Sequence, residues 1–88
     1  MSKHAGPDEY ETGSIYEASY VYLSGVSLVT AFSPDGRRGS TRFIFDNKDD
    51  QARRVAEAYY GGATAPAREL FLSLGRLKDE ATRAIGQQ

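Results

Sequence analysis

The fold is decided by residues 26–45, which read VSLVTAFSPDGRRGSTRFIF. Side chains in residues 26–32 and again in residues 41–45 alternate between two faces, which is the pattern of two β-strands. Between them, residues 33–36 (SPDG) have the chemistry of a type I turn, because proline presets the backbone angle at the second position and glycine is favoured at the fourth. The stretch therefore predicts an antiparallel β-hairpin.

The residues before the hairpin predict a short helix. Ser14 lies three residues before Glu17, the spacing of a capping box in which the hydroxyl and the carboxylate each accept a hydrogen bond from a free backbone amide. Tyrosine and valine in residues 15–23 also favour a strand, but the capping signal favours a helix that ends at Gly25. The apolar face of this helix is predicted to consist of Tyr16, Tyr20 and Leu23.

Two further helices are predicted after the hairpin. Asp46 or Asn47 is placed to cap the first, which ends at the glycines 61–62. The second is expected to start near Thr64 and Pro66. The apolar positions of the first follow helical spacing at Ala52, Val55, Ala56 and Tyr59. The predicted buried stripe of the second comprises Ala67, Leu70, Phe71, Leu74, Leu77 and Ala81.

These elements predict an α+β domain with the order helix, hairpin, helix, helix. A two-stranded hairpin is at best marginally stable alone, so we expect the two C-terminal helices to pack on it. Residues 14–86 then form one small domain. Residues 1–13 combine glycine, proline and acidic residues without periodicity, and we interpret them as a flexible acidic tail.

Composition limits the classes of function. The chain has 88 residues, no cysteine and a formal net charge of −1. The absence of cysteine suits a reducing compartment, and no stretch resembles a signal peptide or a membrane span, so we expect a soluble cytoplasmic protein. The near-neutral charge argues against a general nucleic-acid coat protein.

The inventory for catalysis and for cofactors is thin. The single histidine, His4, lies in the predicted tail, and no serine has a base that the sequence nominates. Read as a calcium-binding loop from Asp46, the acidic run places Lys48 at a ligand position and Gln51 where a glycine is needed. We therefore expect a protein that is not an enzyme and that binds no metal or cofactor.

The tip of the hairpin carries two adjacent arginines, Arg37 and Arg38, between glycines. The GRRG sequence matches the loop of KH domains, but that loop joins two helices and this one joins two strands. Together with Arg42, the pair offers three guanidinium groups that suit phosphate or carboxylate oxygens. The alternative is a solvated tip whose arginines keep a sheet edge soluble.

Six tyrosines are many for so short a chain. Tyr16, Tyr20 and Tyr59 are predicted to lie in the core. Tyr22 and Tyr60 fall off the apolar faces of their helices, and Leu72 is off the stripe of the last helix. Because tyrosine serves interfaces well, we expect these last three residues to contact a partner.

The residues YEASYVYLSGVSLV, the arginine-glycine turn, RFIFD, AYYGG and ARELFLSLGRLK occur in this order. In this arrangement, residues 14–78 resemble a family of short bacterial and phage-borne proteins catalogued only as a domain of unknown function. The resemblance rests on glycines and apolar positions, so it implies a fold and assigns no chemistry.

Two functions remain open. The first is a non-catalytic accessory or adaptor protein that binds another protein or a second copy of itself, using the hairpin, Tyr22, Tyr60 and Leu72. The second is a small nucleic-acid-binding module that contacts phosphates through the hairpin tip, with Arg53 and Arg54 extending the patch. Burial of Tyr60 and Leu72 in the monomer would remove the main support for the first.

Overall fold

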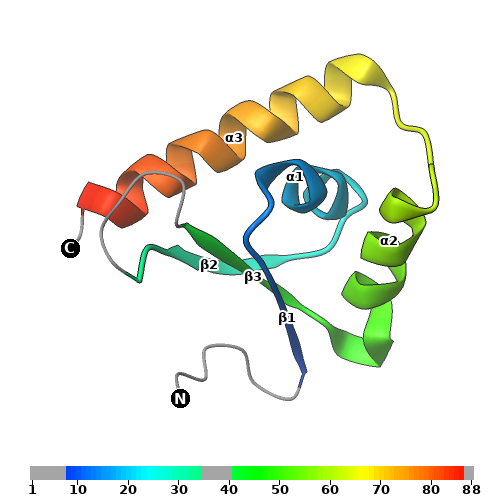
Figure 1. The fold of residues 1–88 in the computed structure, drawn as a ribbon, viewed down its shortest axis with the longest axis horizontal. Helices are drawn as coiled ribbons and strands as arrows, with labels where there is room; N and C mark the ends of the chain where they lie inside the picture. Colours follow the sequence, from blue (N-terminus) through cyan, green and yellow to red (C-terminus); the bar gives the residue numbers. More distant parts are fainter. Residues whose placement is uncertain (1–7, 35–40, 87–88) are drawn as a thin grey trace.

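The computed structural model describes residues 8–34 and 41–86. Its elements are three strands, three α-helices and one short 3₁₀ turn (Figure 1). In chain order they are β1 (Glu9–Thr12), α1 (Ile15–Leu23), β2 (Leu28–Phe32), β3 (Arg42–Asp46), η1 (Lys48–Asp50), α2 (Gln51–Tyr60) and α3 (Ala67–Gly86). The α+β class is confirmed, but the predicted order lacked the first strand.

The sheet is antiparallel throughout, with the order β1-β3-β2. The predicted pairing of β2 with β3 is confirmed, with an irregularity between Leu28 and Thr30. Because β3 is the central strand, Phe43, Ile44 and Phe45 are all buried. The turn between β2 and β3, including Arg37 and Arg38, lies outside the described residues.

Strand β1 corrects the interpretation of residues 9–12 as part of a tail. Tyr10 pairs with Phe45 and Thr12 pairs with Phe43, so the acid-rich EYET segment forms an edge of the sheet. Successive side chains of β1 point to opposite faces of the sheet: Thr12 is buried, whereas its neighbour Glu11 forms an ion pair with Arg42. The strand was not predicted because two of its four residues, Glu9 and Glu11, are acidic and suggested a solvated tail.

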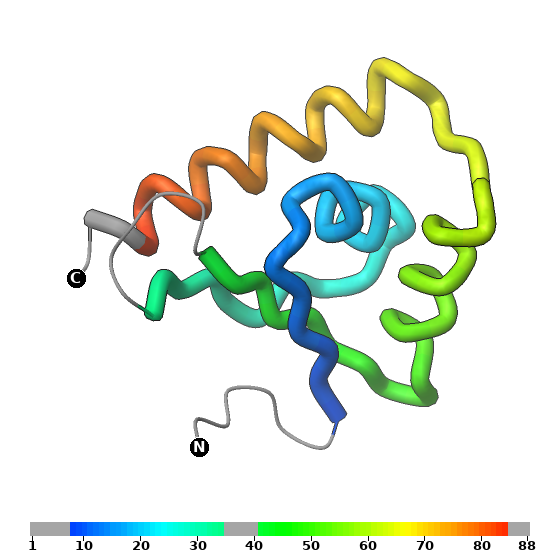
Figure 2. Tube along the Cα trace, viewed as in Figure 1, coloured from blue at the N-terminus to red at the C-terminus, as the bar shows by residue number. Residues whose placement is uncertain are grey.

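Helix α1 is the central helix of the molecule. It packs against α3, against α2 and beside β1, and Figures 1 and 2 show it enclosed by the sheet, α3 and α2. The buried core joins α1 to the sheet and to the other two helices through Ala18, Val21, Val26, Phe43, Phe45, Ala52, Ala56 and Leu77. Since α2 and α3 lie on different sides of α1, they leave part of its surface between them.

Two predicted apolar faces are only partly buried. In α1 the buried residues are Glu17, Ala18, Ser19 and Val21, whereas Tyr16, predicted to be in the core, is 64% exposed. In α3 Leu77 is buried, but Phe71 is 76% exposed. The helix lengths contribute to this difference: α3 is about 30 Å long and α1 only about 14 Å, so α1 cannot cover the whole apolar stripe of α3.

The helix ends follow the local sequence signals, with one difference. The Ser14 hydroxyl accepts a hydrogen bond from the Glu17 amide, and Gly25 has φ +94°, as predicted. The Glu17 side chain, however, does not complete the capping box. Asn47 accepts a hydrogen bond from the Arg53 amide across η1, which satisfies a free donor in the first turn of α2.

No helix in the described parts of the chain is long and apolar enough to cross a membrane.

Candidate protein-binding groove

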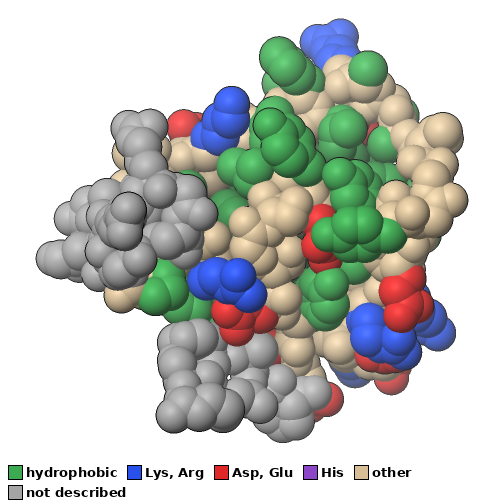
Figure 3. All heavy atoms as spheres, in the orientation of Figure 1, with side chains coloured by type: hydrophobic (Ala, Val, Ile, Leu, Met, Phe, Trp, Pro, Cys, Tyr) green, Lys and Arg blue, Asp and Glu red, His purple; other side chains and the backbone are tan. Residues whose placement is uncertain are grey.

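An apolar hollow of about 340 Å³ lies between α1, α2 and α3. Figure 3 shows hydrophobic side chains gathered on this face, where Figure 1 places α1 and the first half of α3. The lining residues are Tyr16, Ser19, Tyr59, Ala67, Leu70, Phe71 and Leu74. Four of them belong to the stripe of α3 that was predicted to be buried, so this part of the stripe borders a hollow and is not fully covered by α1.

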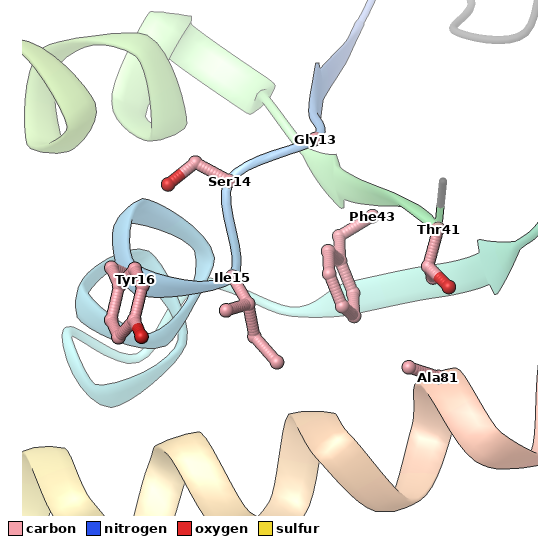
Figure 4. Close-up of a pocket in the computed structure, with 7 residues that line it drawn as sticks. All are labelled: Gly13, Ser14, Ile15, Tyr16, Thr41, Phe43 and Ala81. Carbon is pink, nitrogen blue, oxygen red and sulfur yellow. The ribbon is translucent and has the colours of Figure 1, made fainter. Parts of the chain in front are cut away.

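A second hollow, of about 320 Å³, lies between the start of α1, β3 and the C-terminal part of α3 (Figure 4). Figure 4 shows Ile15 and Phe43 pointing toward the helix that carries Ala81. Its lining residues are Gly13, Ser14, Ile15, Tyr16, Thr41, Phe43 and Ala81. Because Tyr16 lines both hollows, they adjoin one another, and we call the two together the α3 groove.

Three exposed aromatic side chains lie in or beside the α3 groove: Tyr16 and Phe71 line it, and Tyr60 packs against Tyr59, which also lines it. Tyr16, Tyr60 and Phe71 are 64%, 68% and 76% exposed. Since an aromatic residue buries about 150–250 Å² when it is covered, the three together offer on the order of 400 Å². A standard interface buries about 800 Å² on each partner. The aromatics therefore supply about half of such an interface before any rim contact is counted.

A buried carboxylate lies beside the groove. Glu17 is 3% exposed and accepts hydrogen bonds from three hydroxyl groups. The donors are Tyr10 at 2.5 Å, Tyr60 at 2.7 Å and Thr12 at 3.0 Å. Among the described residues, no lysine or arginine forms an ion pair with Glu17. We call these four residues the Glu17 cluster.

The Glu17 cluster keeps both of its phenols protonated to a higher pH than an ordinary tyrosine. Burial and the hydrogen bond to Glu17 raise the pKa of Tyr10 well above its ordinary value, and the nearby charge of Glu57 adds to the effect. The hydrogen bond to Glu17, followed by desolvation, raises the pKa of Tyr60. Both hydroxyls therefore remain donors, and the exposed ring of Tyr60 is held in place by a buried anchor.

Contacts between tyrosine rings connect the Glu17 cluster to the α3 groove. The rings of Tyr59 and Tyr60 meet edge to face with centroids 5.0 Å apart. The ring centroids of Tyr59 and Tyr20 are 5.9 Å apart, with the rings tilted. Tyr59 also lines the first hollow. Aromatic pairs at these distances stabilise one another, so this end of the groove is a preorganised surface.

The structure separates the predicted partner contacts into two places. Tyr60 belongs to the Glu17 cluster, whereas Leu72, which is 64% exposed, shares a different hollow with Tyr22, Ser73 and Arg76. There the Arg76 Nε donates a hydrogen bond of 3.3 Å to the Tyr22 hydroxyl. Tyr60 and Leu72 are thus both exposed, as the protein-binding hypothesis requires, but they do not form one surface.

The arginines proposed to contact phosphate are engaged within the chain where the structure describes them. Arg42 pairs with Glu11 at 2.7 Å. Arg53 pairs with Asp50 and with Glu57, and Arg54 donates to the backbone carbonyl of Asp49. The guanidinium group of Arg53 also lowers the pKa of Asp50. Because each of these three arginines already makes a contact within the chain, they do not form a free cationic patch.

Sequence reasoning missed Tyr10, Thr12, Glu17 and Phe71 as site residues. Glu17 was assigned to the capping box, although a carboxylate within an otherwise apolar helix is itself a signal of a buried contact. The described residues contain no group of three or more histidine, cysteine, aspartate or glutamate side chains placed to hold a metal ion. Every buried side-chain nitrogen or oxygen in these parts of the chain has a hydrogen-bond partner.

Comparisons with protein-family models, curated proteins and solved structures found no match to this chain. The resemblance of residues 14–78 to a family of unknown function therefore stays a prediction.

Proposed function

We propose that this protein is a non-catalytic adaptor that binds a partner protein through the α3 groove. One observation carries the proposal: Tyr16 and Phe71, which are 64% and 76% exposed, line two adjoining apolar hollows, and the 68% exposed Tyr60 lies beside them with its ring against Tyr59. Contiguous apolar surface of this size is typical of interaction sites. Tyrosine and phenylalanine are also enriched at interfaces.

Preorganisation supports the same function. An exposed side chain loses conformational entropy when a partner immobilises it, and this loss opposes binding. The hydrogen bond from Tyr60 to Glu17 and the edge contact with Tyr59 restrict the ring before a partner arrives. Tyr60 therefore has the properties of an interface anchor.

The test compares two neighbouring residues on one helix. Phe71→Asp places a charge in the groove, and Leu72→Asp places the same charge in the separate hollow beside Tyr22. Both residues are exposed, so both variants should keep the fold, which circular dichroism checks.

Each tagged protein is used to capture partners from nuclease-treated native lysate, and captured proteins are then produced and titrated directly. We expect Phe71→Asp to weaken direct binding at least tenfold and Leu72→Asp to change it less than twofold; equal effects would contradict the proposal.

The nucleic-acid alternative receives less support from the described residues, because Arg42, Arg53 and Arg54 are engaged within the chain. It now depends on Arg37 and Arg38, which lie outside the described residues. Contacts with four or five phosphates would give a log–log salt slope of about −3 to −5. Nucleic-acid binding with such a slope, abolished by replacing both arginines with alanine, would favour this alternative.

A further inference from the structure

We infer that the α3 groove receives an amphipathic α-helix of the partner, oriented so that a basic side chain of that helix lies over Tyr60. This inference rests on the proposed function and names the chemistry of the partner. Its three components are the backbone of the groove walls, the spacing of the two hollows and the charge at the Tyr60 end.

The walls of the groove favour a helix over an extended segment. Its lining residues come mainly from α1, α2 and α3, and the one strand that contributes, β3, is the central strand of the sheet. None of the described lining residues lies in the edge strands β1 or β2. An extended segment adds to a sheet by pairing with a strand edge. A segment in this groove must instead satisfy its own backbone groups, as a helix does.

The two hollows have the spacing of one helix face. The α3 residues that line the first hollow, from Ala67 to Leu74, lie seven to fourteen positions before Ala81 of the second, or about 10–21 Å, with eleven positions near the middle of this range. Eleven residues make about three helical turns, so positions i and i+11 of the partner lie on the same face at a matching distance. A partner helix of about 14–16 residues would place one apolar side chain in each hollow.

Charge favours a basic residue at the Tyr60 end. Glu17 forms no ion pair with any described residue, and Arg53 is shared between Asp50 and Glu57. The carboxylate that acts directly on Tyr60 is Glu17, so the negative charge nearest to its ring has no cationic partner among the described residues. The carboxylate that accepts the Tyr60 hydrogen bond also makes the phenol ring richer in electrons, and cations bind to the faces of such rings. A lysine or arginine placed over Tyr60 would contact the face of the ring and would be attracted by the nearby negative charge.

A second copy of the chain matches this site less well. The helix it would insert is α3, whose charges are nearly balanced: Arg68, Arg76, Lys78 and Arg83 against Glu69, Asp79 and Glu80. One of these pairs, Arg83 with Glu80, is already formed at 3.0 Å. A helix with an excess of positive charge complements the Tyr60 end better.

The experiment selects ligands without knowledge of the natural partner. A display library of 16-residue random peptides is panned on the full-length protein, with counter-selection on Phe71→Asp. We expect the enriched sequences to carry apolar residues at i, i+4, i+7 and i+11 with lysine or arginine toward one end. The best synthetic peptide should become helical on binding, and its affinity should fall at least tenfold for Phe71→Asp and less than twofold for Leu72→Asp.

The charge component is tested by a double-mutant cycle. Replacing the basic residue of that peptide by glutamate should weaken binding at least tenfold, and replacing it by alanine should weaken binding several-fold. Tyr60→Leu should weaken the basic peptide several-fold more than the alanine peptide, because only the basic peptide loses a contact between its cation and the ring. Glu57→Gln removes a negative charge at an exposed position, so it should also weaken the basic peptide more than the alanine peptide while leaving the core unchanged.

Several results would overturn the inference. They are enrichment of extended or acidic peptides, no enrichment above the Phe71→Asp background, or a dimer in sedimentation that Phe71→Asp dissociates. These outcomes are distinct from failure of the proposed function, which would appear as equal effects of Phe71→Asp and Leu72→Asp on the captured protein. A partner that needs Phe71 but binds as an extended segment would retain the function and reject the helix.

Discussion

The hydroxyl of Tyr60 donates a hydrogen bond of 2.7 Å to the buried carboxylate of Glu17, which lies 43 positions earlier in the chain. This contact ties the end of α2 to α1 and fixes an exposed aromatic ring at the end of the α3 groove. Tyr10 and Thr12 of β1 donate to the same carboxylate, so one side chain joins three elements of the fold.

Replacing Glu17 by glutamine should destabilise the protein. The amide has only one oxygen to accept the three hydroxyl donors, and its NH₂ group meets hydroxyls that must reorient. Leaving buried polar groups without partners costs about 1–3 kcal/mol, and we expect a loss in this range in the free energy of unfolding from urea denaturation. The control is Glu57→Gln at an exposed position, which should change stability by less than about 0.5 kcal/mol. Equal stability of Glu17→Gln and the natural protein would show that the cluster is not formed as described.

Stability should decrease in alkaline solution. The pKa values of Tyr10 and Tyr60 are raised in the folded state, so folding favours their protonated forms. The stabilisation of the folded state by these two phenols is complete below the pKa of an unfolded tyrosine, about 10. It is lost as the pH rises above that value toward the pKa values of the folded state. Thermal unfolding midpoints should therefore be steady from neutral pH to about pH 9 and then fall. Absorbance of tyrosinate should show two phenols that titrate later than the others, and Tyr10→Phe should remove one of these late phases.

Replacing Asn47 by alanine should weaken the start of α2. The Asn47 side chain accepts the hydrogen bond of the Arg53 amide at 3.0 Å, and loss of such a cap costs about 1 kcal/mol. Chemical denaturation measures the change, and Lys48→Ala at the neighbouring exposed position is the matched control. If both variants unfold at the same denaturant concentration, the Asn47 contact does not act as a cap.

The pairing of β1 with the sheet can be tested through Arg42 and Glu11. Their side chains are 41% and 18% exposed, so screening by solvent limits the coupling free energy to about 0.2–1 kcal/mol. We expect this value from a double-mutant cycle with alanine at both positions, and we expect it to fall at high salt. A coupling of zero at low salt would indicate that β1 is not held on β3 by this pair.

Local sequence patterns predicted much of the fold. The alternation around Phe43 and Phe45 indicated a strand, and the spacing of Ala52 and Ala56 indicated the buried face of α2. Gly25 at φ +94° ended α1 as expected. These features depend on residues within a few positions of one another, which is why the sequence alone identified them.

The candidate site required the tertiary structure, since each of its features depends on residues far apart in the chain. A reading of α3 alone assigned Phe71 to the core, because periodicity shows which face of a helix is apolar but not how much of that face a shorter neighbour covers. Glu17 likewise satisfied a local capping pattern, and only the arrival of β1 and α2 brings Tyr10 and Tyr60 to its carboxylate. The sequence by itself thus determined the three helices and the pairing of β2 with β3, whose signals are local, whereas β1 is defined by its pairing with residues more than thirty positions away. Only the packing of a long α3 over a short α1 decided which apolar surface remains exposed.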